Sequence, residues 1–413
     1  MIDINIIRNN PDVIREAIRK RNKDPSIIEK IVQLDGQRRT LILEIENLRA
    51  QRNKLTKDQA DLGRNIKKQL QDLEPKLKGL DDALQGAMYQ IPNIPLAEVP
   101  EGKDELDNVV VRQCGSPRHF SFLPKDHLEL GEGLGILNIE AASRVVGARF
   151  GYLMGDLALM EIALISYSLK KISEKGFIPV IPPVMISPDV YMRMARLDPG
   201  QEDERYYLPK DDLYLIGSAE HTLGPLHIDQ ILDESMLPIR YVGFSTCFRR
   251  EAGSYGKDTR GILRVHQFDK VEMECFSLPE DGLKEQDLLV SIQEEMMQEL
   301  QLPYMVVSVC TGDMGGPDAR QIDIETWMPS QNKYRETHSA DYMTDYQSRR
   351  LNTRVKRKNG TTEFVHMNDA TAIAIGRTLI AIMENYQNED GSINVPDVLK
   401  PYLQKDRVTR ANS

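Results

Sequence analysis

Arginine, carboxylate and aromatic side chains are concentrated in one stretch, residues 247–276, which reads CFRREAGSYGKDTRGILRVHQFDKVEMECF. Its arginines lie among glycines, at Arg249, Arg250, Arg260 and Arg264. Its second half has a period of two, which predicts a strand with one polar face made of Arg264, His266, Phe268, Lys270, Glu272 and Glu274. Such a face could hold an anion, a flat ring and an ammonium group in series. A solvent-facing hairpin with ordinary cross-strand salt pairs explains the alternation equally well.

A hairpin is expected to position these side chains, with one strand at 241–250, a turn at 251–261 and a returning strand to 276. Elsewhere in the last three hundred residues, helical patterns occur at 156–175, 284–301 and 371–386. Short β-rich segments lie between them, namely YLIG, YVGFSTCF, MVVSVC and QIDIETWMP. This alternation predicts an α+β unit built on an antiparallel β-sheet flanked by helices.

The first hundred residues show a different pattern. Apolar residues recur at alternating spacings of four and three over 27–62 and again over 66–91, which predicts a long antiparallel coiled coil that bends near Gly63. PNIP at 92–95 ends the second segment, and residues 96–120 read as a linker. Pro75 interrupts the second segment, so that helix is expected to kink or begin there, with 63–74 partly a loop.

Charge is unevenly distributed along the 413 residues. Lys and Arg number 53 against 63 Asp and Glu, a net charge of −10, which excludes a protein that coats nucleic acid indiscriminately. Residues 36–80 nevertheless carry about five more cationic than anionic side chains. This basic stretch is either an ordinary solvated coiled-coil face or a projecting lever that grips a phosphate backbone.

The four cysteines, Cys114, Cys247, Cys275 and Cys310, are far apart and form no CxxC pair. The spacing predicts neither a disulfide framework nor a zinc cluster, and it fits a reducing, cytoplasmic setting. No uncharged run approaches the roughly 18 residues of a membrane span, and the N-terminus lacks the apolar core of a signal peptide. We therefore expect no contact with a membrane.

Several stretches, taken together, resemble a known family. FRREAGSYGKDTRGILRVHQFDKVE resembles motif 2 (about 244–276) of class II aminoacyl-tRNA synthetases, and of seryl-tRNA synthetases in particular. GFIPVIPP resembles motif 1 (about 176–186), IAIGRTLIAIMENYQ resembles motif 3 (373–387), and the coiled coil resembles the family's tRNA-binding arm. The resemblance implies a helical arm at 1–100 and a class II aminoacylation catalytic domain at 101–413.

The same resemblance implies an ATP site. Arg249 would hold the α-phosphate and Arg377 the γ-phosphate, both as catalytic residues, while Glu251 and Phe268 would bind adenine. The implied site comprises Arg249, Glu251, Val265, Phe268, Glu336, Ser339 and Arg377. Glu336 and Ser339 would hold the Mg²⁺ that accompanies ATP, and no zinc is expected.

Serine would be held by Ser218, Glu220, Arg249, Glu272 and Thr371. Taken singly, these residues have plain alternatives, since serine often serves a turn, threonine often caps a helix and a buried glutamate often forms a salt bridge. Three positions depart from the family pattern: Ser218 stands where threonine is usual, Asp369 stands where asparagine is common, and Arg250 stands where serine is frequent. Asp369 adds a carboxylate near a site that admits a carboxylate substrate, so it must either point away or be paired.

The implied activity is that of a serine--tRNA ligase, which forms seryl-adenylate from L-serine and MgATP and loads the 3′ end of tRNA(Ser). The resemblance also implies a cytoplasmic homodimer with the segment around Pro183 at its interface. The cations expected to contact tRNA are Arg49, Arg52, Lys54 and Lys57. Two alternatives are a ligase that loads an amino acid on a carrier protein and a non-catalytic paralogue that binds tRNA through the arm.

Overall fold

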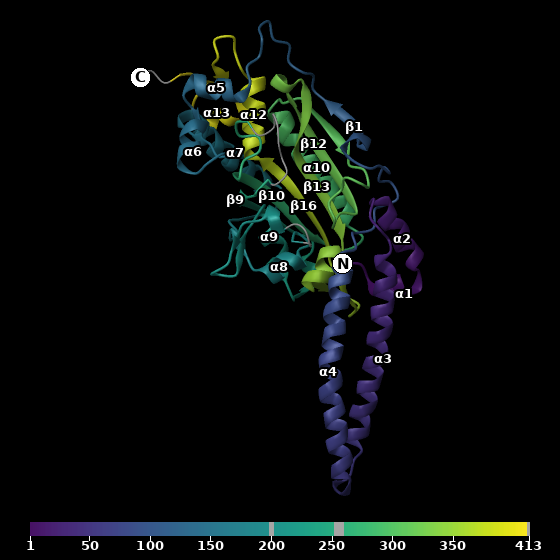
Figure 1. Ribbon diagram of the computed structural model, residues 1–413. Helices are drawn as coiled ribbons and strands as arrows, with labels where there is room; N and C mark the ends of the chain where they lie inside the picture. The colour runs from purple at the N-terminus through teal and green to yellow at the C-terminus, as the bar shows by residue number, and fades with distance from the viewer. Residues whose placement is uncertain (198–201, 252–259, 411–413) are drawn as a thin grey trace. The chain divides into compact units, whose positions relative to one another are not determined.

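The computed structural model describes residues 1–197, 202–251 and 260–410, which form two compact units, Met1–Ile94 and Pro95–Ser413 (Figure 1). Most of the turn expected at 251–261 lies outside the described residues. In the described ranges, no helix is both long and apolar enough to cross a membrane.

The first unit is a helical hairpin preceded by two short helices. Its elements are α1 (Ile4–Asn9), α2 (Pro11–Lys20), α3 (Ile27–Asn53), a 3₁₀ turn (Lys57–Gln59) and α4 (Ala60–Tyr89). Figure 1 shows α3 and α4 side by side and antiparallel. The expected apolar positions pack between them, with Leu41, Ile45 and Leu48 of α3 against Ile66, Leu70, Leu73 and Leu77 of α4. The predicted coiled-coil hairpin is confirmed.

Two details of the hairpin differ from expectation. The bend lies at 54–59, before Gly63, because Thr56 and Gln59 form a capping box that starts the second helix early. The prediction that the second helix begins at Pro75, with 63–74 partly a loop, is wrong, because α4 runs through that residue without interruption. Pro75 is exposed, and the leucines on either side of it, Leu73 and Leu77, hold the helix against α3.

The second unit is built on an eight-stranded sheet. In spatial order its strands are β1 (Val109–Cys114), β11 (Tyr304–Ser308), β12 (Arg320–Met328), β13 (Lys333–Thr344), β16 (His366–Ala374), β10 (Gln267–Ser277), β9 (Ile239–Phe248) and β4 (Ile178–Val180). All neighbouring strands are antiparallel except β4, which runs parallel to β9. The predicted α+β class with an antiparallel sheet is confirmed.

Three helices, α7 (Gly155–Ser173), α10 (Gly282–Glu299) and α12 (Ile375–Asn385), share one hydrophobic core with the sheet (Figure 1). Strand β10 contributes Val271, Met273 and Cys275 to this core, as its period of two predicts. The alternate residues of β10 therefore point to the opposite face, which is where the polar side chains gather.

Smaller elements complete the unit. Its other helices are α5 (His127–Leu134), α6 (Ile139–Val145), α8 (Pro188–Arg193), α9 (Glu220–Leu223), α11 (Tyr346–Leu351) and α13 (Lys400–Leu403). The short strands are β2 (Leu137–Asn138), β3 (Tyr152–Leu153), β5 (Met185–Ile186), β6 (Tyr207–Leu208), β7 (Leu213–Leu215), β8 (Ile231–Asp233), β14 (Arg354–Lys356), β15 (Thr362–Phe364), β17 (Ile393–Asn394) and β18 (Arg407–Val408).

Three boundaries in this unit differ from the sequence-based expectation. The supposed linker at 96–120 contains β1, which pairs with β11 and forms one edge of the sheet. The returning strand begins only at Gln267, so Arg264 and His266 precede it. The helix expected at 371–386 begins at Ile375, because β16 continues to Ala374 through its pairing with β10.

Candidate active site

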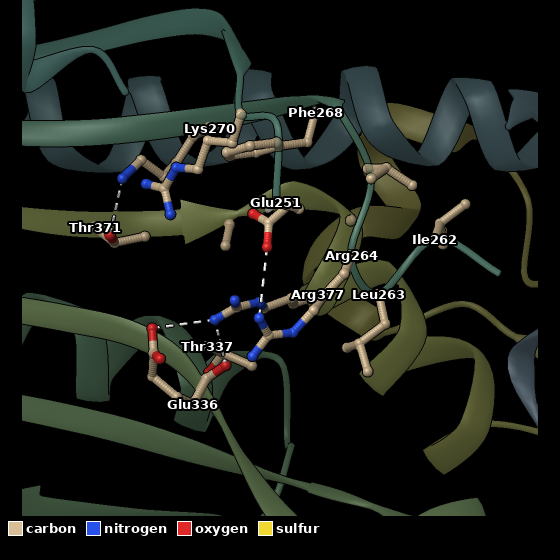
Figure 2. Close-up of a pocket in the computed structure, with 14 residues that line it drawn as sticks. Glu251, Ile262, Leu263, Arg264, Phe268, Lys270, Glu336, Thr337, Thr371 and Arg377 are labelled. Atoms are coloured by element: carbon tan, nitrogen blue, oxygen red, sulfur yellow. Dashed lines mark hydrogen bonds and ion pairs between the residues drawn. The ribbon is translucent and has the colours of Figure 1, made fainter. Parts of the chain in front are cut away.

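A cavity of about 590 Å³, which we call the main cavity, opens on the polar face of the sheet (Figure 2). Its walls come from β10, β13, β16, the first turn of α12 and the segments on either side of the undescribed turn. The lining residues are Arg249, Glu251, Ile262, Leu263, Arg264, Val265, Phe268, Lys270, Glu336, Thr337, Thr371, Ala374, Gly376 and Arg377. Six of the seven residues expected at the ATP site are among them; Ser339 is not.

Arg249 is held at the end of β9 by three contacts. Its Nε donates to the carbonyl of Gly217 at 3.0 Å, and its backbone N–H donates to the carbonyl of His266 at 3.0 Å. Its guanidinium carbon lies 5.3 Å from the ring centroid of Phe268. The cation and the aromatic ring therefore share one wall of the main cavity, a combination suited to a nucleotide.

Glu251 has a left-handed backbone conformation, with φ of 49°. Its carbonyl accepts a hydrogen bond from Arg149 Nη1 at 2.6 Å, and its carboxylate lies 3.4 Å from Arg264 Nη1 (Figure 2). A non-glycine residue in this conformation costs about 1 kcal/mol or more, so these two arginines are needed to hold it.

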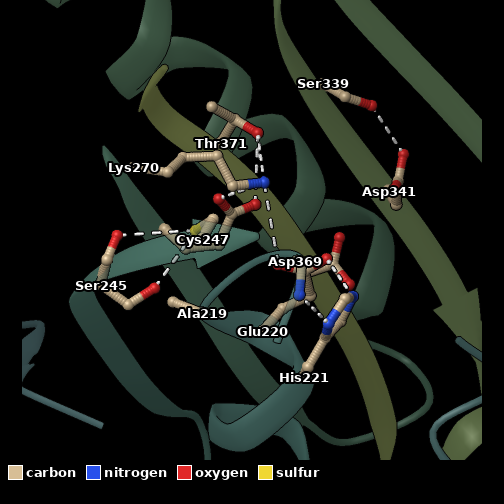
Figure 3. A network of polar contacts seen from close by, with 12 residues as sticks. Ala219, Glu220, His221, Ser245, Cys247, Lys270, Ser339, Asp341, Asp369 and Thr371 are labelled. Atoms are coloured by element: carbon tan, nitrogen blue, oxygen red, sulfur yellow. Dashed lines mark hydrogen bonds and ion pairs between the residues drawn. The ribbon is translucent and has the colours of Figure 1, made fainter. Parts of the chain in front are cut away.

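Arg377 lies in the first turn of α12 and pairs with Glu336 of β13. Its Nη1 donates to the carbonyl of Glu336 at 2.8 Å and to Oε1 at 3.0 Å (Figure 2). Desolvation acts to raise the pKa of Glu336, but Arg377 and Arg249 overcome it and hold that pKa below its usual value. Glu336 is therefore a carboxylate at neutral pH. Ser339 instead donates to Asp341 Oδ1 at 3.0 Å, outside the cavity lining (Figure 3).

A group of buried polar side chains adjoins the main cavity through Thr371, which belongs to the cavity lining. We call it the polar pocket, and it consists of Ser218, Glu220, Glu272 and Thr371, all buried. Thr371 Oγ1 donates to Glu272 Oε1 at 3.2 Å, because the register of β16 on β10 sets these two residues opposite each other. Among the described residues, Ser218 Oγ has no hydrogen-bond partner. The structure brings Glu220, Glu272 and Thr371 around one lysine, Lys270, and these are three of the five residues expected to bind serine. Arg249 lines the main cavity instead.

Lys270 closes the polar pocket toward the main cavity (Figure 3). Its Nζ lies 2.9 Å from Glu272 Oε2, 3.4 Å from Thr371 Oγ1 and 3.8 Å from Glu220 Oε2. The sequence placed Lys270 on the polar face of β10 but not in the site. The available signal was its position two residues from both Phe268 and Glu272 on one strand.

The two glutamates of the polar pocket respond differently to burial. Burial raises the pKa of Glu272 to about 8, although Lys270 opposes the shift. Burial acts in the same direction on Glu220, but Lys270, His221 and Arg196 hold its pKa well below the usual value. Burial lowers the pKa of His221 to about 4, so that imidazole is neutral at pH 7. Without ligand, the polar pocket therefore holds one ionised carboxylate, that of Glu220, and one ammonium group, that of Lys270.

Asp369 is paired. Its Oδ2 lies 2.8 Å from Nη2 of Arg196, a residue that follows α8 and was missed in the sequence. Burial raises the pKa of Asp369 to about 6, against the effect of Arg196. The carboxylate of Asp369 is therefore paired with a cation of the protein. The sequence analysis expected Asp369 either to be paired in this way or to point away from the site.

The remaining predicted residues lie outside both sites. Pro183 is exposed between β4 and β5, and its carbonyl accepts a hydrogen bond from Thr222 Oγ1 at 3.0 Å. Arg49 pairs with Glu74 across the hairpin at 2.8 Å. Arg52 and Lys54 are exposed near the bend, and the side chain of Lys57 lies outside the described part of the structure.

The antiparallel sheet and its arginine-lined cavity define a class II aminoacyl-tRNA synthetase core. Residues 205–386 match the family model of the tRNA synthetase class II core domain (G, H, P, S and T). Residues 1–95 match the model of the seryl-tRNA synthetase N-terminal domain.

Full-length relatives agree with both matches. A serine--tRNA ligase of Symbiobacterium thermophilum is 41% identical over 99% of this chain and all of its own length. The crystal structure of seryl-tRNA synthetase from Pyrococcus horikoshii complexed with ATP superposes with a TM-score of 0.94 at 38% identity, covering all of both chains. The cytoplasmic serine-tRNA ligase of Naegleria fowleri in complex with AMP gives 0.90 at 34%, covering 100% of this chain and 99% of its own.

The chain belongs to the seryl-tRNA synthetase family, and its activity is the ATP-dependent attachment of serine to tRNA. The predicted family, enzyme class and function are confirmed. The two alternatives are not favoured, because the match extends over both the arm and the catalytic core.

Proposed function

We propose that the main cavity binds ATP, that the polar pocket binds L-serine, and that the two sites together make seryl-adenylate before serine is transferred to the 3′ end of tRNA(Ser). The single observation that carries this proposal is the adjacency of the two sites. Arg249, Phe268 and Arg377 line the main cavity, and Lys270 and Thr371 belong both to this lining and to the group of buried hydroxyl and carboxylate side chains beside it.

The first step joins two anions. An oxygen of the serine carboxylate bonds to the α-phosphorus of ATP, the bond to the bridging oxygen breaks, and pyrophosphate leaves. Arg249 would neutralise both the carboxylate and the α-phosphate, while Arg377 would hold the γ-phosphate. No general base is required, because the attacking carboxylate is already ionised. The contribution of the chain is therefore alignment and charge neutralisation.

Amino acid selection is assigned to the polar pocket. A substrate hydroxyl would bond to Thr371 and Glu272, and Ser218 Oγ offers a further partner. Alanine would leave these buried groups without hydrogen bonds, which is why such a pocket rejects it strongly. Threonine would be rejected by lack of space for its methyl group.

Glu336 is the proposed magnesium ligand. It is ionised, it lines the main cavity, and carboxylate and hydroxyl oxygens are the donors that Mg²⁺ prefers. Among the described residues, no group of three or more His, Cys, Asp or Glu could hold a metal alone, which fits an ion that takes most of its ligands from phosphates and water. When bound, Mg²⁺ would neutralise phosphate charge. Ser339 remains the second proposed ligand.

Amino-acid-dependent ATP–pyrophosphate exchange without tRNA tests the site assignment. We expect exchange with serine and little with threonine, alanine, glycine or cysteine. Glu272→Gln should raise the KM for serine by about 10- to 100-fold and leave the KM for ATP unchanged, since the amide replaces one carboxyl oxygen of the pocket with an N–H donor. Glu389→Gln, in an exposed loop, is the matched control. An unchanged serine KM in Glu272→Gln would overturn the pocket assignment.

The arm, residues 27–89, is proposed to bind tRNA through the cations near its bend. Arg52 and Lys54 are exposed there, as a phosphate contact requires. Replacing Arg49, Arg52, Lys54 and Lys57 together with alanine should raise the KM for tRNA and weaken its dependence on salt, while pyrophosphate exchange stays intact. If the same variant loses ATP–pyrophosphate exchange, these side chains are needed for folding and are not specific to tRNA binding.

A homodimer is proposed from exposed apolar side chains on two neighbouring elements. Leu159 and Ile162 of α7, Ile178 of β4 and the nearby Ile181 are all at least half exposed. Apolar residues gathered in this way mark a contact surface, and the motif 1 segment that contains Pro183 lies among them. The proposed occupant of this surface is a second copy of the chain.

The cytoplasm is the proposed location. All four cysteines are free. Burial raises the pKa of the Cys247 thiol to about 12 and that of Cys275 well above its usual value, so neither is poised to form a disulfide. Free, unreactive thiols are typical of a reducing compartment.

A further inference from the structure

Side chains that are proposed to bind serine already hold a cation of the protein. Nζ of Lys270 lies within 4 Å of Glu272, Thr371 and Glu220, three of the four members of the polar pocket. An α-ammonium group could use the same partners, because the carboxylates attract its charge and the threonine hydroxyl accepts a hydrogen bond from it. Figure 3 shows the lysine side chain extended toward Thr371 and Glu220.

The charge of the polar pocket does not balance two such cations. The side chains of Lys270 and Glu220 are each 8% exposed and that of Glu272 only 3%, so the charges are almost fully removed from water. Glu220 is a firm carboxylate, whereas burial favours the protonated form of Glu272. One positive charge therefore matches the unliganded pocket, and a second would be repelled at low dielectric.

The side chain of Lys270 has an alternative location in the main cavity. It belongs to the lining of the main cavity as well as to the polar pocket, and its four-carbon stem is flexible. The phosphates of bound ATP would supply anions on that side. The same side chain can thus reach either site without movement of β10.

We propose that Lys270 is a specificity-determining residue that competes with serine from within the protein: its ammonium occupies the place of the substrate ammonium in the empty pocket and moves into the main cavity when serine binds. The inference rests on the proposed serine site. It follows that only a ligand with an ammonium group displaces Lys270 from the polar pocket. Glycerate, the analogue of serine with a hydroxyl in place of the amino group, does not displace it.

The rival arrangement is a fixed lysine that orients Glu272 while serine binds beside it. The two arrangements predict opposite effects of deleting the ammonium. An internal competitor lowers the apparent affinity by the fraction of protein whose pocket it occupies, so its removal strengthens serine binding. A fixed orienting group strengthens binding, so its removal weakens serine binding.

The test measures serine affinity without ATP, by calorimetry, in the full chain. We expect Lys270→Met to lower the Kd for serine at least about threefold, and Lys284→Met, which removes an exposed lysine on α10, to leave it unchanged. In Lys270→Ala, ethylammonium should compete with serine for the vacated place. Weaker or unchanged serine binding in Lys270→Met, or restoration of serine binding to Lys270→Ala by ethylammonium, would overturn the proposal.

A second measurement uses the unaltered protein, in case the variants do not fold. Acylation of Lys270 by an amine-reactive reagent, read by peptide mass spectrometry, should increase when serine is saturating and should not increase with glycerate. Equal or lower labelling with serine contradicts the proposal. Failure of the serine site itself is recognised separately, because Glu272→Gln would then bind serine as tightly as the unaltered chain.

Discussion

Buried ionisable side chains around the polar pocket occur in matched pairs. Arg196 faces Asp369, and Lys270 faces Glu220 and Glu272. Each cation holds a carboxylate that burial alone would drive toward its neutral form. At position 369 the charge of Arg196 offsets that of the aspartate.

This charge matching leads to a prediction on pH. Lys270, Glu220 and Asp369 are the charged groups that act on Glu272, and only Lys270 lowers its pKa. In Lys270→Met the pKa of Glu272 rises above about 8, so the ammonium group of zwitterionic serine must displace a proton from Glu272. The Kd for serine should then fall as the pH rises, by up to about tenfold per pH unit.

In the unaltered protein one ammonium replaces another, so the Kd should stay nearly constant between about pH 6.5 and 8.5. Calorimetry across that range distinguishes the two profiles, and the Lys284→Met variant serves as the control. A steep profile in the unaltered protein would contradict cation exchange in the pocket.

The residues of the site were predictable to different degrees. A period of two put Phe268, Lys270 and Glu272 on one face of β10, and the resemblance to motifs 2 and 3 supplied Arg249 and Arg377. No local pattern indicates Arg196, because its partner Asp369 lies 173 residues further along the chain. That pair exists only through tertiary packing.

At the scale of elements, the heptad spacing predicted α3 and α4 well, whereas their ends depended on capping. Apolar side chains at spacings of four and three fix which faces meet. The bend is fixed instead by Thr56 and Gln59, whose side chains satisfy the first turn of the second helix. A single proline therefore predicts the end of a helix less well than the apolar residues on either side of it predict that the helix continues.

Pro75 offers a direct test of that ranking. Its ring removes one backbone N–H from an otherwise continuous helix and faces solvent, so Pro75→Ala should stabilise the arm by up to about 3 kcal/mol. Hydrogen exchange of amides in residues 70–80 of the full chain should slow accordingly. Lys76→Ala, an exposed neighbour, should change exchange only slightly. Unchanged exchange in Pro75→Ala would mean that the proline is fully accommodated by its surroundings.

At the scale of the whole molecule, the proposed dimer depends on a surface that the monomer leaves apolar. Ile162 lies on α7 and is 59% exposed, so a charge there costs the monomer little but would be desolvated at an interface. Ile162→Asp should shift the sedimentation of the protein from dimer to monomer and reduce aminoacylation.

Ile231→Asp is the matched control, since Ile231 is 62% exposed but lies on a different sheet, in β8. Its sedimentation should equal that of the unaltered chain. A monomeric unaltered chain at micromolar concentration, or a dimeric Ile162→Asp variant, would contradict the assigned surface.

Strand β1 sets a limit on how the chain can be divided. Residues 109–114 form the outer strand of the sheet and cover the backbone of β11. A fragment that starts at residue 120 would leave the N–H and C=O groups of β11 without partners, and such an open edge invites pairing between molecules. A fragment that starts near Pro95 keeps the edge covered. The first would therefore aggregate and the second stay dispersed, although both contain every residue assigned to the main cavity and the polar pocket.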